Sequence, residues 1–207
     1  MTKSTTAKKP KAPKENPHPD GRRERSRSSR AKIVAALLKL VAEGEISPSA
    51  ARVAETAGVG LRSVFRHFDD MDALYREMSD EMEAKILPML KKPYESDDWR
   101  SQLLELADRS AKVFDMMMPY RISANIKRFQ SEYLMEDYKR ILKLENDQVG
   151  RILPPAVKAD RVRAKAIMLT VSFNSWRRLR YDEGMSAKAS KAVIIQMLED
   201  ILSRIQD

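Results

Sequence analysis

The chain contains no cysteine among its 207 residues. Disulfides, thiol catalysis and zinc sites built on thiolates are therefore excluded, and a reducing cytoplasm is the expected location. Glycine is scarce, with six residues, and we find no glycine-rich phosphate loop, internal repeat or alternating strand pattern. No segment approaches the roughly 18 apolar residues of a membrane span, and no apolar run of the signal-peptide type follows the basic N-terminus. We therefore expect no membrane partner and no export by that route.

Groups suited to catalysis or metal binding are also few. Histidine occurs only twice, and His67 is the only one outside the N-terminal tail. No nucleophile, general base or set of metal ligands is visible, so we expect no catalytic residues, no metal and no cofactor. An enzyme is the least supported of the functions weighed below.

Helix-forming residues and charge are abundant. Hydrophobic residues make up 43% of the chain and charged residues 33%, and Ala, Leu, Lys, Arg, Glu and Met dominate, which predicts an all-α fold. A first helix is expected from near Ser26 until Gly44 ends it, and a second with Ser47 as its N-cap and Pro48 at its first position. The remaining helices are expected over about 71–90, 99–117, 131–153, 160–182 and 186–205, with a short piece around 121–129.

Positive charge is concentrated at the N-terminus. The net charge is +9, and residues 1–30 hold ten Lys or Arg against three acidic residues, which gives 10 − 3 = +7. We interpret residues 1–24 as a disordered basic arm. Such an arm favours a polyanionic partner, most often nucleic acid, although a solubilising tail is the alternative. Arg23 and Arg25, where the arm ends, are candidate DNA contacts.

The stretch "AETAGVGLRSVFRHF", residues 54–68, has the features of a helix-turn-helix. Two helices that cross steeply need a small residue at the crossing and a turn with an unusual backbone. Ala54 and Gly58 stand at those places. Val53, Ala57 and Val59 can supply the small apolar core around them.

On a helical wheel of the second helix, Val64 and Phe68 fall together with Leu61 nearby, so these three are expected to face the core. The outward face and its flanks then carry Arg62, Ser63, Phe65, Arg66 and His67. Arginine can bond guanine in pairs, and an aromatic edge can meet a thymine methyl. A merely solvated charged face is the alternative interpretation.

Residues about 26–78, with "VAETAGVGLRSVFRHFDDMDALY" at their centre, resemble the DNA-binding domain of the tetracycline repressor (TetR) family. The resemblance lies in the helix-turn-helix, the aromatic-x-His-Phe end and the acidic-Leu-Tyr start of the fourth helix. It implies a helix-turn-helix DNA-binding domain at 25–70 and a helical effector-binding and dimerisation domain at 71–207. The residues it implies near DNA are Ser49, Gly60, Leu61, Arg62, Ser63, Phe65, Arg66 and His67.

Two positions depart from that family's pattern. The family usually has Tyr where this chain has Phe65, and Lys where it has Met71. Both family residues commonly touch phosphates, so the resemblance implies weaker phosphate anchoring here. The basic arm and Arg62 or Arg66 are candidates to replace it.

For the C-terminal part, the resemblance implies a homodimer and a small-molecule effector of unknown identity. Apolar stripes along the last two expected helices favour dimerisation through Trp176, Val193, Ile194, Met197 and Ile201, although both stripes can also face the monomer's own core. Candidate effector contacts are Phe114, Met117, Met118, Tyr120, Phe129, Tyr133 and Phe173. Methionines and aromatics can line an adaptable pocket, but at helical spacing they are also typical of plain core.

We therefore expect a TetR-like transcriptional regulator, a homodimeric repressor that a ligand releases from a palindromic double-stranded DNA operator. The alternative is an architectural protein that coats DNA without sequence preference and has no effector.

Overall fold

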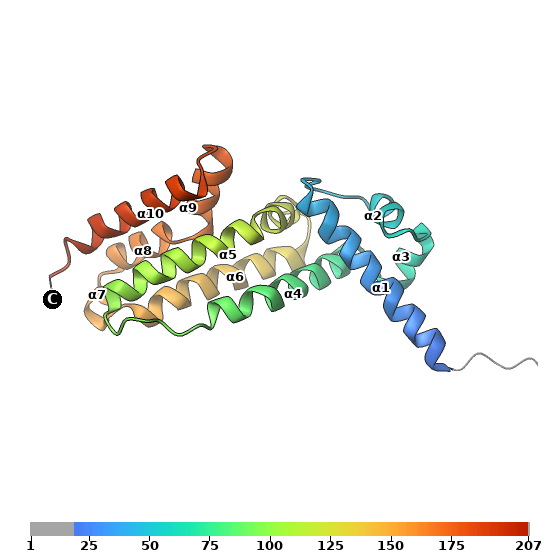
Figure 1. Ribbon diagram of the computed structural model, residues 1–207, viewed down its shortest axis with the longest axis horizontal. Coiled ribbons are helices and arrows are strands. Elements are labelled where there is room, and N and C mark those ends of the chain that lie inside the picture. The colour runs from blue at the N-terminus through green and yellow to red at the C-terminus, as the bar shows by residue number, and fades with distance from the viewer. Residues whose placement is uncertain (1–18, 207) are drawn as a thin grey trace, which may run out of the picture.

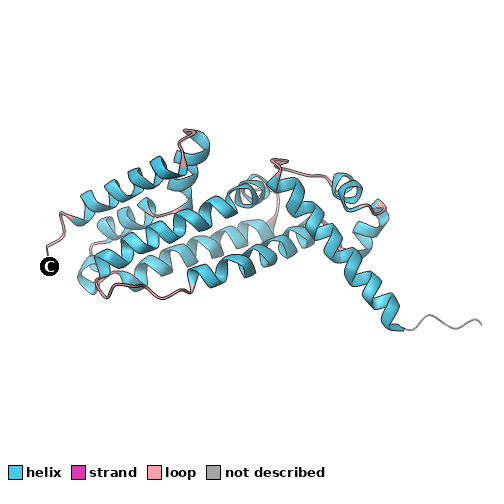
Figure 2. Cartoon of the chain, viewed as in Figure 1, coloured by secondary structure: helices cyan, strands magenta, loops and turns pink. Residues whose placement is uncertain are grey.

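The structure is a computed structural model and describes residues 19–206, with side chains from Arg23 onward. Within these residues Figure 2 shows only helices and loops, so the all-α expectation is confirmed there. The α-helices are α1 (Pro19–Ala42), α2 (Ala50–Ala57), α3 (Leu61–His67), α4 (Met71–Leu90), α5 (Trp99–Lys127), α6 (Glu132–Ile152), α7 (Pro155–Ala159), α8 (Arg161–Thr170), α9 (Phe173–Arg177) and α10 (Ala187–Leu202). A short π-helix, η1 (Arg178–Asp182), continues from α9.

The molecule is elongated, with α1, α2 and α3 at one end (Figure 1). Helices α4, α5 and α6 run side by side away from that end, and α8 and α10 lie at the opposite end, where the chain terminates. The start of α1 projects beyond the rest of the molecule.

The buried side chains form two clusters. The first, which we call the N-terminal core, joins α1, α2, α3 and α4 and includes Ile33, Leu37, Val53, Val64 and Tyr75. The second, the body core, joins α5 to the helices that follow it and includes Leu103, Ile167, Phe173 and Leu198.

Among the contacts that connect these cores are two made by α5. Met117 of α5 packs against both clusters. The hydroxyls of Tyr75 in α4 and Ser123 in α5 share a hydrogen bond of 2.9 Å, and both side chains are fully buried. Because an unpaired buried hydroxyl is costly, this bond fixes α4 against α5.

The N-terminal boundary of the ordered chain was predicted incorrectly. Helix α1 begins at Pro19 and not near Ser26, so residues 19–24 of the expected disordered arm are helical. Residues 1–18 lie outside the described residues. The expected domain boundary after residue 70 stays a prediction, and we note that Leu74 and Met78 of α4 pack into the N-terminal core.

The predicted end of α5 was wrong. Helix α5 does not stop near Met117 but continues through Pro119 to Lys127, absorbing the short piece expected around 121–129. Proline removes one hydrogen bond, but the burial of Arg121 and Ser123 on the following turns holds the helix together.

The single helix expected over 160–182 is instead divided after Thr170. Ser172 accepts a hydrogen bond from the Ser175 N–H at 3.3 Å and donates one to the Leu169 carbonyl at 2.8 Å. It thus caps α9 and covers an end of α8, which is a local alternative to a continuous helix.

None of the helices over residues 19–206 has the length and apolar character needed to cross a membrane.

Candidate nucleic-acid interface

Helix α2 is positioned by a cap at each end. The Ser49 hydroxyl, and not that of Ser47 as predicted, accepts a hydrogen bond from the Arg52 N–H at 3.2 Å. In the structure Pro48 precedes the cap, so the cap lies two residues later than predicted. At the other end Gly58 has φ +65°, a left-handed conformation that favours glycine.

The turn after α2 is built as the sequence predicts. Ala54 is buried at the crossing, and its carbonyl accepts a hydrogen bond from the Val59 N–H at 3.0 Å. Val53 is also buried, whereas Ala57 and Val59 are half-buried against the N-terminal core. The two helices of a helix-turn-helix are therefore present.

Helix α3 packs through Val64 and Phe68, both almost fully buried. Leu61 was also expected in the core, but its side chain is 45% exposed. Side chains point back toward the N-terminus of a helix. Since Leu61 is the first residue of α3, its side chain therefore extends past the edge of the core. The exposure agrees with the position near DNA that the resemblance implies.

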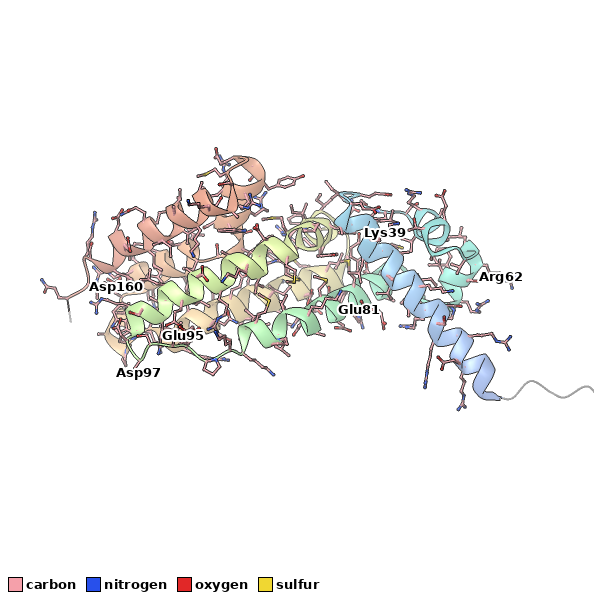
Figure 3. The ribbon with its side chains drawn as sticks, viewed as in Figure 1. Lys39, Arg62, Glu81, Glu95, Asp97 and Asp160 are labelled. Carbon is pink, nitrogen blue, oxygen red and sulfur yellow. The ribbon has the colours of Figure 1, made fainter. Side chains whose placement is uncertain are left out.

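The outer face of α3 carries two arginines without a hydrogen-bond or ion-pair partner among the described residues. Arg62 and Arg66 are exposed, and neither forms a hydrogen bond or an ion pair among the described residues. Arg62 lies at one end of the molecule and points away from it (Figure 3). Between them Ser63 is half-buried and Phe65 is 50% exposed. Guanidinium groups without partners remain available to an external acceptor.

A different arginine holds α3 in place. Arg30 of α1 donates to the His67 carbonyl at 2.5 Å and to the Glu77 carboxylate at 2.7 Å, and its guanidinium lies 4.3 Å from the Phe68 ring centre. The end of α3 is thereby tied to α1 and α4. Sequence reasoning counted Arg30 only as part of the basic N-terminus. Its position one turn before Ile33 and on the same stripe was the available signal.

His67 contributes no charge to this face at neutral pH. Burial lowers the pKa of His67 below its ordinary value of 6.5, and the charges of Arg66 and Arg30 lower it further. Its Nε2 atom is buried and makes no hydrogen bond. The positive charge at α3 therefore comes from the arginines.

The remaining DNA candidates lie beside the turn and on the projecting part of α1. Gly60 precedes α3 as its N-cap, in an extended conformation. Arg23 and Arg25 are exposed on α1 before its packed portion begins. The role of all these residues in binding DNA stays a prediction.

The structure distributes the effector candidates over both cores and the surface. Phe114 and Phe173 stack edge-to-face in the body core with Met118 beside them, whereas Tyr120 and Tyr133 pack against the N-terminal core, and Met117 touches both. Phe129 is 75% exposed and lies under the Arg128 guanidinium, 4.6 Å away. These residues do not converge on one cavity, and their role stays a prediction.

The dimerisation candidates also divide. Trp176 and Ile194 are buried in the body core of a single chain, so they are unsuited to direct contact with a partner. Ile201 and Val193 are half-buried, and Met197 is 45% exposed. Sequence reasoning missed Val162 and Leu169 of α8, which are 83% and 63% exposed. Val162 stands alone between two arginines, and Leu169 lies within a continuous apolar run, so neither gave a signal of exposure.

Within the described residues no group of three or more His, Asp or Glu side chains is placed to hold a metal ion.

The fold is that of TetR-type transcriptional regulators, which confirms the resemblance at the level of structure. A transcriptional regulator from Rhodococcus sp. Rha1 matches with a TM-score of 0.65 and 18% identity over 84% of this chain and 96% of its own. NalD, the secondary repressor of the MexAB-OprM multidrug efflux pump in Pseudomonas aeruginosa, matches with a TM-score of 0.58 and 18% identity over 86% of this chain and 96% of its own.

A third structure, a putative TetR-family regulator from Rhodococcus sp., matches with a TM-score of 0.55 and 15% identity over 86% of this chain and 98% of its own. No family model matches the sequence, and no curated protein is significantly similar to it.

Proposed function

We propose that this protein is a DNA-binding transcriptional regulator that reads duplex DNA with α3. The observation that carries the proposal is the outer face of α3, where Arg62 and Arg66 project unpaired beside Ser63 and the exposed Phe65. A helix of this kind fits the major groove, where guanidinium groups pair with guanine and an aromatic edge contacts the thymine methyl. The fold likeness to transcriptional regulators supports the same function.

Contacts to the DNA backbone are proposed for the helix ends and for α1. The N-terminus of α2, capped by Ser49, lies in the same unit as α3. The projecting start of α1 carries Arg23, Arg25 and Arg27. Phosphate contacts of this kind set the orientation on the duplex without reading its sequence.

We further propose that the protein acts as a homodimer on a palindromic operator. One α3 of seven residues reads too few base pairs for a specific search, and two-fold binding doubles the site. Val162 and Leu169 of α8 and Met197 of α10 are apolar, exposed and carried by helices that lie next to one another. They are the proposed centre of the interface, with Val193 and Ile201 at its edge.

Repression and release by a small molecule complete the proposal. NalD is described as a repressor, and the same role is proposed here. Release requires that a ligand favour a conformation in which two recognition helices no longer match the roughly 34 Å between major grooves. The Tyr75–Ser123 hydrogen bond and Met117 are the contacts that would carry such a change from the body to α4 and the N-terminal core.

The decisive experiment is recovery of bound sequences from random DNA with wild-type protein and with Arg62→Ala. We expect a palindromic consensus, and for Arg62→Ala a loss of affinity of roughly 1–3 kcal/mol with relaxed preference at one base pair of each half-site. Lys39→Ala is the matched control, because Lys39 is exposed on the same unit but pairs with Glu43 at 3.9 Å. No consensus at about 0.15 M salt would support the architectural alternative instead.

The dimer is tested with Val162→Glu combined with Met197→Glu, followed by analytical ultracentrifugation. Both side chains are exposed, so the folded monomer tolerates the change while an apolar interface does not. Ile194→Glu is unsuitable, because Ile194 lies in the body core and its loss unfolds the chain. A monomeric wild type that binds a palindrome tightly at micromolar concentration contradicts the dimer.

A further inference from the structure

An open groove lies between helices α6 and α8 on the body, far from α3. Its volume is about 810 Å³, within the usual range for small-molecule sites. Arg151 of α6, Lys158 of α7, and Arg161 and Lys165 of α8 line it. Asp147 is the single acidic side chain on its wall, so the lining carries a net charge of 4 − 1 = +3. None of the residues considered above as effector contacts takes part.

These four cations are not neutralised by a neighbouring acidic side chain among the described residues. All four are exposed, and none makes a hydrogen bond or an ion pair with another described residue. Arg161 and Lys165 lie four residues apart on one helix face, where like charges repel. The lining therefore carries positive charge that no neighbouring acidic side chain compensates.

A second groove on the same body provides the comparison. It has a volume of about 610 Å³ and lies between α5 and α10. There Asp108 pairs with Lys112 at 2.8 Å and with Lys191, and Lys92 pairs with Glu95 at 3.3 Å. The cations of that groove are thus neutralised by neighbours, whereas those between α6 and α8 are not. Both grooves are lined by several cations, so surface charge alone does not explain why those between α6 and α8 lack acidic partners.

A glycine provides an independent observation. Gly150 lies inside α6 on the groove wall, without a positive φ, and a methyl group added there would meet nothing within 4 Å. Glycine inside a helix costs about 0.5–1 kcal/mol relative to alanine. Neither backbone conformation nor packing accounts for it, but its missing side chain leaves space in the groove, which Ala164 and Met168 also line.

We propose that this groove binds a small multivalent anion that carries phosphate or carboxylate groups. Arg151 and Arg161 offer planar donors that match such groups in pairs, and Lys158 and Lys165 add charge. Lys165 lies three residues after Val162 and four before Leu169, so it shares their side of α8, and the groove borders the proposed dimer interface.

The test is titration calorimetry of the full chain with inorganic pyrophosphate and, separately, with citrate at about 0.15 M ionic strength. Binding of pyrophosphate alone identifies a phosphate ligand, and binding of citrate alone a carboxylate ligand. Arg151→Gln combined with Lys165→Gln should weaken binding at least about tenfold. Gly150→Leu should do the same by filling the groove without changing its charge.

Two controls separate this site from other positive surfaces. Lys143→Gln removes an exposed, unpaired cation of α6 that does not line the groove, and Arg62→Gln with Arg66→Gln removes the charge of α3. Both should bind as the wild type does. Equal binding by the groove variants, loss of binding in the α3 variant, or no binding by the wild type at millimolar anion overturns the proposal. Because no DNA is present, failure here leaves the proposed regulator function untouched.

Discussion

The arginines of α3 and the buried Arg121 of the body show two opposite uses of the same side chain. At the N-terminal end Arg62 and Arg66 project into solvent without partners, whereas in the body Arg121 is buried and pairs with Glu145. Arg121 also lies 3.7 Å from the Phe173 ring centre, and Glu145 accepts a hydrogen bond from the Phe173 N–H at 3.4 Å. The Arg121–Glu145 pair thus holds helices of the body together, and the charge on α3 is left available to a ligand.

A second charged side chain, Asp115, joins the body to its C-terminal helices. Asp115 of α5 accepts hydrogen bonds from the Trp176 ring nitrogen and from Arg180, each at 2.9 Å. These bonds join segments more than sixty residues apart. Removing one of these paired charges should therefore cost stability in the body, whereas removing an arginine of α3 should cost binding.

Replacing Arg121 by alanine should give the largest effect. The change leaves Glu145 partly buried without its partner, which costs about 3–5 kcal/mol of unfolding free energy. Urea unfolding followed by circular dichroism measures it. Arg121→Met with Glu145→Leu removes both charges and should recover most of the loss. A loss below about 1 kcal/mol for Arg121→Ala would mean that the pair has little structural role.

Phe65→Ala sharpens the contrast at the other end. The Phe65 ring is half exposed and belongs to neither core, so the unfolding free energy should change by no more than about 0.5 kcal/mol. Affinity for the selected operator should fall by about 1 kcal/mol as apolar contact with a base is lost. Fluorescence anisotropy with labelled operator measures the fall, and an unchanged affinity places Phe65 outside the interface.

Gly150→Ala, in contrast to Arg121→Ala, should stabilise the protein. The added methyl group meets no atom and the helix loses a flexible residue, so the unfolding free energy should rise by about 0.5–1 kcal/mol. Thermal unfolding of the variant beside the wild type tests this. A decrease would reveal a packing role for Gly150 that its open surroundings do not suggest.

The smallest effect is expected from His67 on acidification. Its folded pKa lies below the unfolded value of 6.5, so the unfolded chain binds more protons as pH falls. The contribution of neutral His67 is therefore complete above pH 6.5 and is lost as pH falls from 6.5 through the folded pKa. Urea midpoints at pH 7.5 and 5.5 should differ less in His67→Gln than in the wild type. An equal difference means that other groups cause the pH dependence.

The N-terminal unit was the more predictable half because short-range rules govern it. Gly58 needs a left-handed backbone, and Ala54 must be small, so sequence alone located the turn. Leu61 was misplaced because the wheel describes direction but not where a core ends. Arg30 was missed because its partners Glu77 and His67 lie 47 and 37 residues away in the chain.

The body was less predictable because tertiary contacts override local signals there. Pro119 usually marks a helix end, yet burial of Arg121 and Ser123 carries α5 past it. Ser172 interrupts an apolar run that reads as one helix, through hydrogen bonds that a hydrophobic pattern does not contain. The α6–α8 groove depends on two helices meeting, so no single stretch of sequence indicates it.

The length of α5 determines how far a small change in its tilt moves its ends. Its 29 residues, at 1.5 Å each, span roughly 43 Å, and the helix contacts both the body core, at Leu103, and the N-terminal core, at Ala124. A rod of that length acts as a lever. A tilt of about 5° at one end displaces the other by about 4 Å, which is close to the 3.4 Å spacing of bases along a DNA strand. Under the proposed function, a rotation of a few degrees in the body would therefore be enough to shift a recognition helix by about one base.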